Sequence, residues 1–189
     1  MSVVVKMMYS FNSFLGFLFA FLLSCNKTTH DPTTELHNRY RLVEVTTDRP
    51  VDVNFDGEFN TDLTLEIPKL ENILLVADRE LSYINILWVE PQVNGGMLYR
   101  PLPSAYDASD DIQYQPVQNL IYYRQEGKII TLTTRAENDP SRHYTFAPSN
   151  KLNIDGSDGI LWFNASQEFL TTGGVETFQL IVKYAPEKS

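Results

Sequence analysis

Hydrophobic and polar residues alternate over much of the chain after residue 39, which is the pattern of β-strands that bury one face. In the clearest segment, 177–184, one face of the predicted strand carries Phe178, Leu180, Val182 and Tyr184. Shorter segments of the same kind are separated by turn-forming Gly, Pro, Asn and Asp residues, at 40–46, 113–124, 129–134 and 160–163. Short strands at this spacing predict an all-β domain, either an antiparallel β-barrel or a β-sandwich.

Residues 70–90 allow two interpretations. Apolar residues fall at helical spacing, which would suit an amphipathic helix, at Leu70, Ile73, Leu74, Ala77 and Leu81. Alternatively, residues 73–76 and 82–89 form a β-hairpin that turns at Asp78 and Arg79, with alternate residues of the second arm on one face. We favour the hairpin.

Two features interrupt the strand pattern in the middle of the chain. Residues 90–111 are rich in Pro, Gly and Asp and predict an unusually long loop, of the kind that often serves as a lid or lacks fixed structure. Pro116 lies within the next strand, 113–124, and cannot donate a backbone hydrogen bond. We therefore expect this strand to be interrupted or bulged at Pro116 and to lie at an edge of the sheet.

The N-terminal part of the chain predicts export. An apolar segment, 14–25, follows Lys6 and is too short to span a bilayer comfortably, which is typical of a secretory signal peptide. Its last four residues, Leu22-Leu23-Ser24-Cys25, resemble the lipobox of bacterial lipoproteins. This resemblance implies that a signal peptide, 1–24, is removed and that Cys25 carries a diacylglycerol thioether, usually with an acyl chain such as palmitate on its amine.

These boundaries predict a simple domain organisation. Residues 25–38 are polar and lack periodicity, so they form a flexible tether behind the lipidated cysteine. Residues 39–189 then form a single β-barrel domain, because a chain of that length can bury one full core without disulfides.

Charge and cysteine usage exclude several function classes. The formal net charge of −9 becomes −10 when Lys6 is lost with the leader. A nucleic-acid partner would need clustered Lys and Arg, so none is expected. The chain has one cysteine, Cys25, which excludes disulfides, zinc–thiolate sites and cysteine catalysis in the mature protein once that thiol is lipidated.

The segment 52–62 resembles the start of a calcium-binding loop. Oxygen donors stand at loop positions 1, 3, 5, 7 and 9, namely Asp52, Asn54, Asp56, Glu58 and Asn60, and Gly57 supplies the turn at position 6. Position 12, where a bidentate carboxylate normally completes the site, is Leu63. The alternative is an Asx-rich turn whose side-chain oxygens accept hydrogen bonds from backbone amides. Calcium is therefore a possible cofactor, and no other is expected.

A further resemblance combines the lipobox, the first strand at 40–46 and the Asp-x-Asn-x-Asp-Gly sequence at 52–57. Together these are similar to lipocalin-like lipoproteins of Bacteroidota. The resemblance implies an antiparallel lipocalin-like β-barrel on a lipid tether.

Aromatic residues on several predicted strands could line a barrel cavity or simply fill the core, namely Trp88, Tyr122, Tyr123, Trp162, Phe163 and Phe178. Simple core packing is the commoner outcome. The three histidines, His30, His37 and His143, share no metal-ligand spacing. Because no catalytic motif is recognised either, we expect a protein that is not an enzyme.

The sequence therefore predicts a lipid-anchored envelope lipoprotein that binds a small apolar ligand or an envelope protein partner. Known lipoprotein sorting rules favour the periplasmic face of the outer membrane, since Asn26 rather than aspartate follows Cys25 and residues 27–29 lack the acidic run associated with surface export. The alternative is an accessory subunit of an outer-membrane complex or an inhibitor of a cationic enzyme, which the acidic charge would suit.

Overall fold

The structure, a computed structural model, describes residues 36–98, 100–135, 142–155 and 158–187. All of them belong to one compact unit, Pro32–Ser189. The predicted signal peptide, Cys25 and most of the tether lie outside the described residues.

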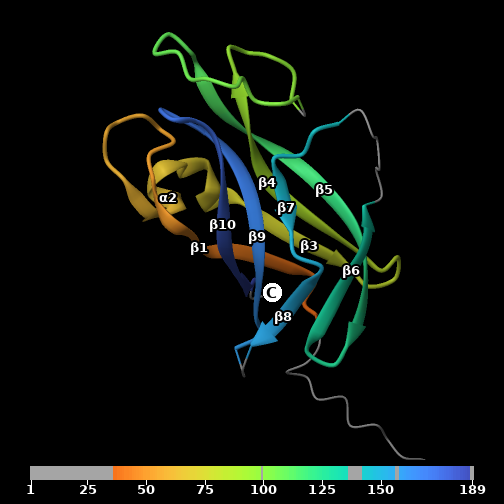
Figure 1. Cartoon of the computed structure of the whole chain (residues 1–189). Coiled ribbons are helices and arrows are strands. Elements are labelled where there is room, and N and C mark those ends of the chain that lie inside the picture. The colour runs from red at the N-terminus through yellow and green to blue at the C-terminus, as the bar shows by residue number, and fades with distance from the viewer. Residues whose placement is uncertain (1–35, 99, 136–141, 156–157, 188–189) are drawn as a thin grey trace, which may run out of the picture. The chain divides into compact units, whose positions relative to one another are not determined.

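This unit is a closed antiparallel β-barrel (Figure 1). Its sheet has ten strands. β2 (Asn60–Asp62) pairs only with β1, and β7 (Phe146–Pro148) pairs only with β9, so these two strands lie outside the closed ring of the barrel. The other eight strands are β1 (Arg39–Val51), β3 (Leu74–Asp78), β4 (Tyr83–Val93), β5 (Ile112–Glu126), β6 (Ile129–Arg135), β8 (Lys151–Asp155), β9 (Ile160–Thr171) and β10 (Gly174–Pro186). They are ordered β10-β1-β3-β4-β5-β6-β8-β9, and the pairing of β9 with β10 closes the ring. The predicted lipocalin-like barrel is thus confirmed over the sandwich.

The two helices of the described chain are short and consecutive, α2 (Leu63–Glu66) and the 3₁₀-helix η2 (Pro68–Asn72). Asp62 caps α2, since its carboxylate accepts a hydrogen bond from the Thr64 amide at 3.0 Å. Pro68 occupies the start of η2, where its missing N–H costs nothing. No helix among the described residues has both the length and the apolar character needed to cross a membrane.

The hairpin predicted within residues 70–90 is confirmed. β3 and β4 pair with Leu75 opposite Ile86, and both side chains are fully buried. The apolar spacing that suggested a helix has another origin, because Leu70 belongs to η2 and Leu81 is exposed in the turn. Burial against the barrel core therefore prevails over local helical periodicity.

β5 is continuous, and the expected interruption at Pro116 is wrong. Pro116 pairs with Val89 of β4 in unbroken register, while the register shift of this strand lies further along, between Ile121 and Tyr123. The expected edge position is correct in part, because β6 pairs with β5 only from Ile121 onward. Since Pro116 has no N–H to offer a second neighbour, it suits a part of β5 that, among the described residues, pairs only with β4.

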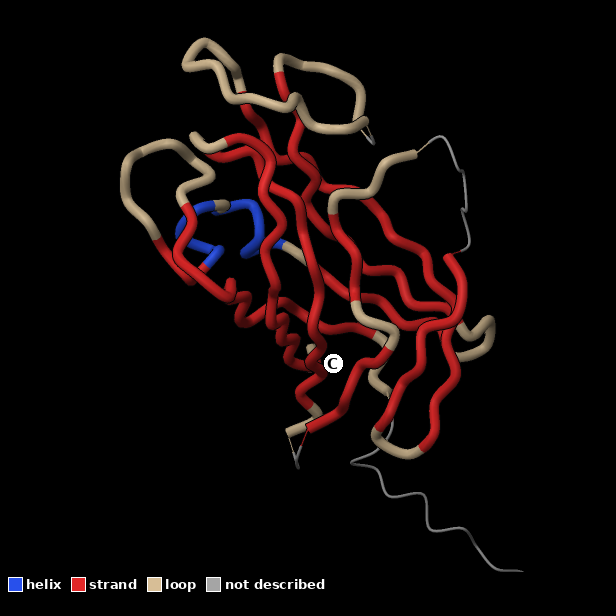
Figure 2. The backbone as a smooth tube through the Cα atoms, viewed as in Figure 1, coloured by secondary structure: helices blue, strands red, loops and turns tan. Residues whose placement is uncertain are grey.

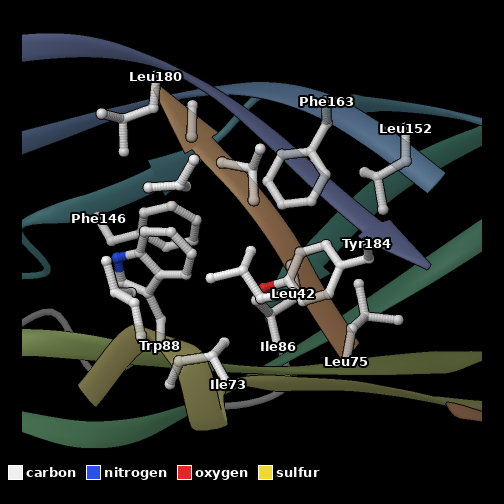
Figure 3. Packing of buried hydrophobic residues seen from close by; sticks show 14 of the residues in the cluster. Leu42, Ile73, Leu75, Ile86, Trp88, Phe146, Leu152, Phe163, Leu180 and Tyr184 are labelled. Atoms are coloured by element: carbon white, nitrogen blue, oxygen red, sulfur yellow. The ribbon is translucent and has the colours of Figure 1, made fainter. Parts of the chain in front are cut away.

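Large apolar side chains fill the barrel (Figure 3). The ring planes of Trp88 and Phe146 stack with centroids 4.2 Å apart, and Phe163 stacks on Tyr184 at 6.1 Å. Of the aromatic residues that the sequence singled out, Trp88, Tyr123, Phe163 and Phe178 are buried in this core, Trp162 is half-buried, and Tyr122 is 46% exposed. Core packing is thus the role of most of them.

Three connections gather at one end of the barrel, which we call the mouth. Antiparallel pairing brings together the ends of β1, β4 and β9 there, so the β1–β2 loop, the β4–β5 loop and the β9–β10 turn lie at the same end (Figure 2). A Cβ on Gly174, in that turn, would lie 3.0 Å from the backbone oxygen of Ser104, so the β4–β5 loop closely approaches the turn.

Candidate functional site

A cavity of about 520 Å³ opens at the mouth. Its walls come from the β1–β2 loop, from α2 and η2, and from the end of the β4–β5 loop with the start of β5. The lining residues are Val53, Asn54, Phe55, Glu66, Ile67, Pro68, Lys69, Tyr106, Asp110, Asp111, Ile112, Gln113 and Tyr114. This volume and the mixture of apolar walls with a few polar groups are typical of small-molecule sites.

Glu66 is the buried carboxylate of this cavity, with 1% of its surface exposed. Its oxygens accept hydrogen bonds from the Val53 amide at 3.1 Å and from Asn60 Nδ2 at 2.6 Å. The helix α2 holds the carboxylate in place, and these two donors tie the β1–β2 loop to the helix. Both of these donors are neutral groups.

Tyr114 forms another wall of the cavity. Its hydroxyl donates to the Val53 backbone oxygen at 3.4 Å, and its own backbone oxygen accepts from Lys69 Nζ at 2.8 Å. Burial, with a further contribution from the charge of Glu66, raises the pKa of Tyr114 well above its ordinary value. The phenol is therefore neutral at physiological pH and serves as a hydrogen-bond donor within the wall.

Phe55 and Tyr106 form a stacked pair that joins the two long loops. Their ring centroids lie 4.2 Å apart with an interplanar angle of 8°. Phe55 has a φ of 60°, a left-handed backbone conformation that costs a bulky residue roughly 1–2 kcal/mol. Such strain persists only where the surroundings impose it, and here the stack holds the ring against the β4–β5 loop.

The acidic rim of the cavity is built by the end of the β4–β5 loop. Asn94 fastens this loop, since its Nδ2 donates to Asp110 Oδ1 at 2.7 Å and its Oδ1 accepts from the Asp111 amide at 2.9 Å. Asp110 also accepts from the Asp107 amide at 3.0 Å. Asn94 adopts a φ of 52°, which Asn tolerates better than most residues. Hydrogen bonds therefore hold the end of the long loop where it borders the cavity.

The residues predicted to bind calcium form a chain of turns. Oδ1 of Asn54 accepts from the Asp56 amide at 3.1 Å, and Oδ1 of Asp56 accepts from the Glu58 amide at 2.8 Å. Asp52 Oδ2 accepts from the Gly57 amide at 3.0 Å, while its Oδ1 is buried without a hydrogen-bond partner. This arrangement is the one expected of the Asx-rich turn.

The other two proposed calcium ligands, Glu58 and Asn60, do not take part in this chain of turns. Glu58 is exposed, and Asn60 opens β2 and donates to Glu66. Among the described residues, no three His, Cys, Asp or Glu side chains gather in a way that would hold a metal ion. Of the two interpretations of this loop, these hydrogen bonds favour the Asx-rich turn, and calcium binding itself stays untested. Lipidation of Cys25, which lies outside the described residues, stays a prediction.

A second polar cluster lies in the barrel core, and sequence reasoning did not identify it. Glu90 of β4 is 1% exposed and accepts from the backbone amides of Thr145 and Phe146 at 3.1 and 3.4 Å, and from the Thr145 hydroxyl. Nearby, Gln167 accepts from Trp88 Nε1 at 2.8 Å and donates to the Val89 oxygen at 3.1 Å. Glu90 thus attaches the segment at the start of β7 to β4, and Gln167 attaches β9 to β4.

The alternation of residues along β4 could have identified Glu90 as a buried carboxylate. It continues the inward face of β4 after Ile84, Ile86 and Trp88, where an apolar residue would be expected. A carboxylate at that position requires buried donors, which the backbone of residues 145 and 146 supplies.

The cavity itself was also missed by sequence reasoning, although parts of it lie in segments that were noticed. Glu66 lies outside the calcium-like segment 52–62, and Asp110 and Asp111 belong to the predicted long loop 90–111. The structure brings these three carboxylates to one cavity.

No family model, no curated protein and no solved structure matches the chain.

Proposed function

We propose that this protein is a non-enzymatic binding protein whose barrel carries a small ligand in the mouth cavity. The supporting observation is the cavity of about 520 Å³, walled by three segments that are distant in sequence. Bulky buried side chains such as Trp88, Phe146 and Phe163 occupy the barrel interior, so the mouth is the better place for a ligand (Figure 3).

The proposal includes the location that the sequence predicts. A lipid on Cys25 holds the barrel at the periplasmic face of the outer membrane, and the polar residues after it act as a tether. Acyl chains contribute about 0.8 kcal/mol per buried CH₂, and a multiply acylated cysteine anchors stably. The acidic barrel therefore needs no membrane-binding surface of its own.

Fluorescence titration with N-phenyl-1-naphthylamine, an apolar dye that brightens when it leaves water, tests the binding function. The soluble domain from residue 26 is compared with its Ile112→Trp variant, in which a larger ring fills the cavity from the start of β5. A matched control, Ile160→Trp, places the same ring at the start of β9, at the other end of the barrel.

We expect the unmodified domain and Ile160→Trp to bind the dye alike, and Ile112→Trp to bind at least about tenfold more weakly, a difference of about 1.4 kcal/mol. Circular dichroism checks that both variants remain folded. Equal dye binding by a folded Ile112→Trp variant would overturn the mouth cavity as the binding site.

A further inference from the structure

The mouth cavity has an unbalanced charge. Three carboxylates line it, those of Glu66, Asp110 and Asp111, against the single ammonium of Lys69. The cavity also carries apolar and aromatic walls, so it is not simply a solvated acidic face. An excess of negative charge within low-dielectric walls strengthens the attraction for a positive ligand.

The ammonium of Lys69 does not balance this charge through contact. Its Nζ donates to the Tyr114 backbone oxygen at 2.8 Å, and no ion pair joins it to a lining carboxylate within the described part of the chain. The carboxylates instead accept from neutral groups. Glu66 uses the Val53 amide, Asp110 uses Asn94 and the Asp107 amide, and Asp111 uses Gln113 Nε2 at 2.9 Å.

The aromatic walls favour the same kind of ligand. The stacked pair of Phe55 and Tyr106 and the ring of Tyr114 border the cavity. A cation placed over the face of an aromatic ring is attracted by the ring's quadrupole, and quaternary ammonium ligands are commonly recognised by aromatic side chains. A calcium ion, by contrast, needs six to eight oxygen ligands, which apolar walls do not supply.

We propose that the mouth cavity selects organic cations, a protonated amine or a quaternary ammonium carried on an apolar or aromatic body. This inference rests on the proposed ligand-binding function and adds the charge of the ligand. The apolar body lies against residues such as Ile67 and Ile112, while the cationic group lies near the carboxylates and the ring faces.

Three soluble ligands of similar shape separate charge from shape, namely 2-phenylethylamine, 2-phenylethanol and 3-phenylpropanoate. Binding to the isotopically labelled soluble domain is followed by amide chemical shifts at low salt. We expect the amine to bind at least about fivefold more tightly than the alcohol, and the carboxylate to bind most weakly, with shifts at the residues lining the cavity. Raising the salt concentration should weaken only the preference for the amine.

The variant Asp111→Asn removes one rim charge with little structural change, because an amide oxygen can still accept from Gln113. Asp155→Asn is the matched control, an exposed carboxylate at the end of β8 away from the mouth. We expect Asp111→Asn to weaken amine binding by about threefold to fivefold and to leave alcohol binding unchanged. Asp155→Asn should change neither.

The outcomes distinguish the two proposals. Equal binding of amine and alcohol at the cavity would overturn cation selection and leave the binding function intact. Tighter binding of the carboxylate would also overturn it. Shifts away from the mouth, or no binding of any ligand together with no dye binding, would overturn the proposed function itself.

Discussion

Glu90 illustrates how a single buried carboxylate can replace part of a strand pairing. The amides of Thr145 and Phe146 donate to the side chain of Glu90 across the barrel, and β7 pairs only with β9. Buried amides must find acceptors, and a carboxylate can serve more than one of them. Glu90 thereby holds the segment around β7 against the core.

Substitution Glu90→Gln should therefore destabilise the barrel. The amide group that replaces the carboxylate has one accepting oxygen and adds donors where donors already converge. We expect a loss of about 1–3 kcal/mol in the free energy of unfolding, measured by urea denaturation of the soluble domain. Glu80→Gln, an exposed position in the β3–β4 turn, is the control and should change stability little. Equal midpoints for the two variants would contradict this role.

At the scale of elements, the β4–β5 loop is positioned by the β9–β10 turn as well as by Asn94. Gly174 has a φ of 105°, and a Cβ there would approach the Ser104 oxygen to 3.0 Å. Gly95, also with positive φ, has no neighbour within 4 Å of an added Cβ. The two positions therefore separate backbone strain from the contact between loop and turn.

Gly95→Ala should cost about 1 kcal/mol of unfolding free energy from its backbone alone. Gly174→Ala should cost more, since its Cβ also collides with the loop, and it should shift the amide resonances of residues 104–111. Thermal unfolding and amide spectra measure both effects. A Gly174→Ala variant with the stability of Gly95→Ala and an unchanged loop spectrum would show that this contact does not position the loop.

The β1–β2 loop yields a prediction about calcium. Because Asn54, Asp56 and Asp52 already accept hydrogen bonds from backbone amides within the loop, we expect the turn to form without an ion. The thermal midpoint should be the same in millimolar calcium and in chelator. A rise in calcium that Asp52→Asn abolishes would contradict this expectation, since an ion that binds only the folded state must stabilise it.

Elements with strong alternation were predictable from the sequence, and their contacts across the barrel were not. The segment 177–184 lies within β10, and the β3–β4 hairpin follows its period-two pattern. Pro116 led us to expect an interruption that is absent, because its unbroken register with β4 depends on the whole sheet and not on the local sequence. The candidate cavity forms where three segments that are distant in sequence meet, and no local sequence pattern predicts such a meeting.

At the scale of the whole molecule, the sequence separates an N-terminal targeting segment from an acidic barrel. A Cys25→Ser variant should be found in the soluble fraction of its host, because the thioether cannot form without the thiol. Fractionation and mass spectrometry of the N-terminus measure this. A Cys25→Ser protein that remains in the membrane fraction would contradict the lipid anchor.

Ligand binding is proposed at the mouth and not inside the barrel. Amide chemical-shift mapping of the labelled domain, titrated with N-phenyl-1-naphthylamine, tests it most directly. We expect the largest shifts at residues that line the mouth cavity, namely Val53, Phe55, Tyr106, Ile112 and Tyr114. Shifts centred on Trp88 and Phe146 in the barrel core would contradict it.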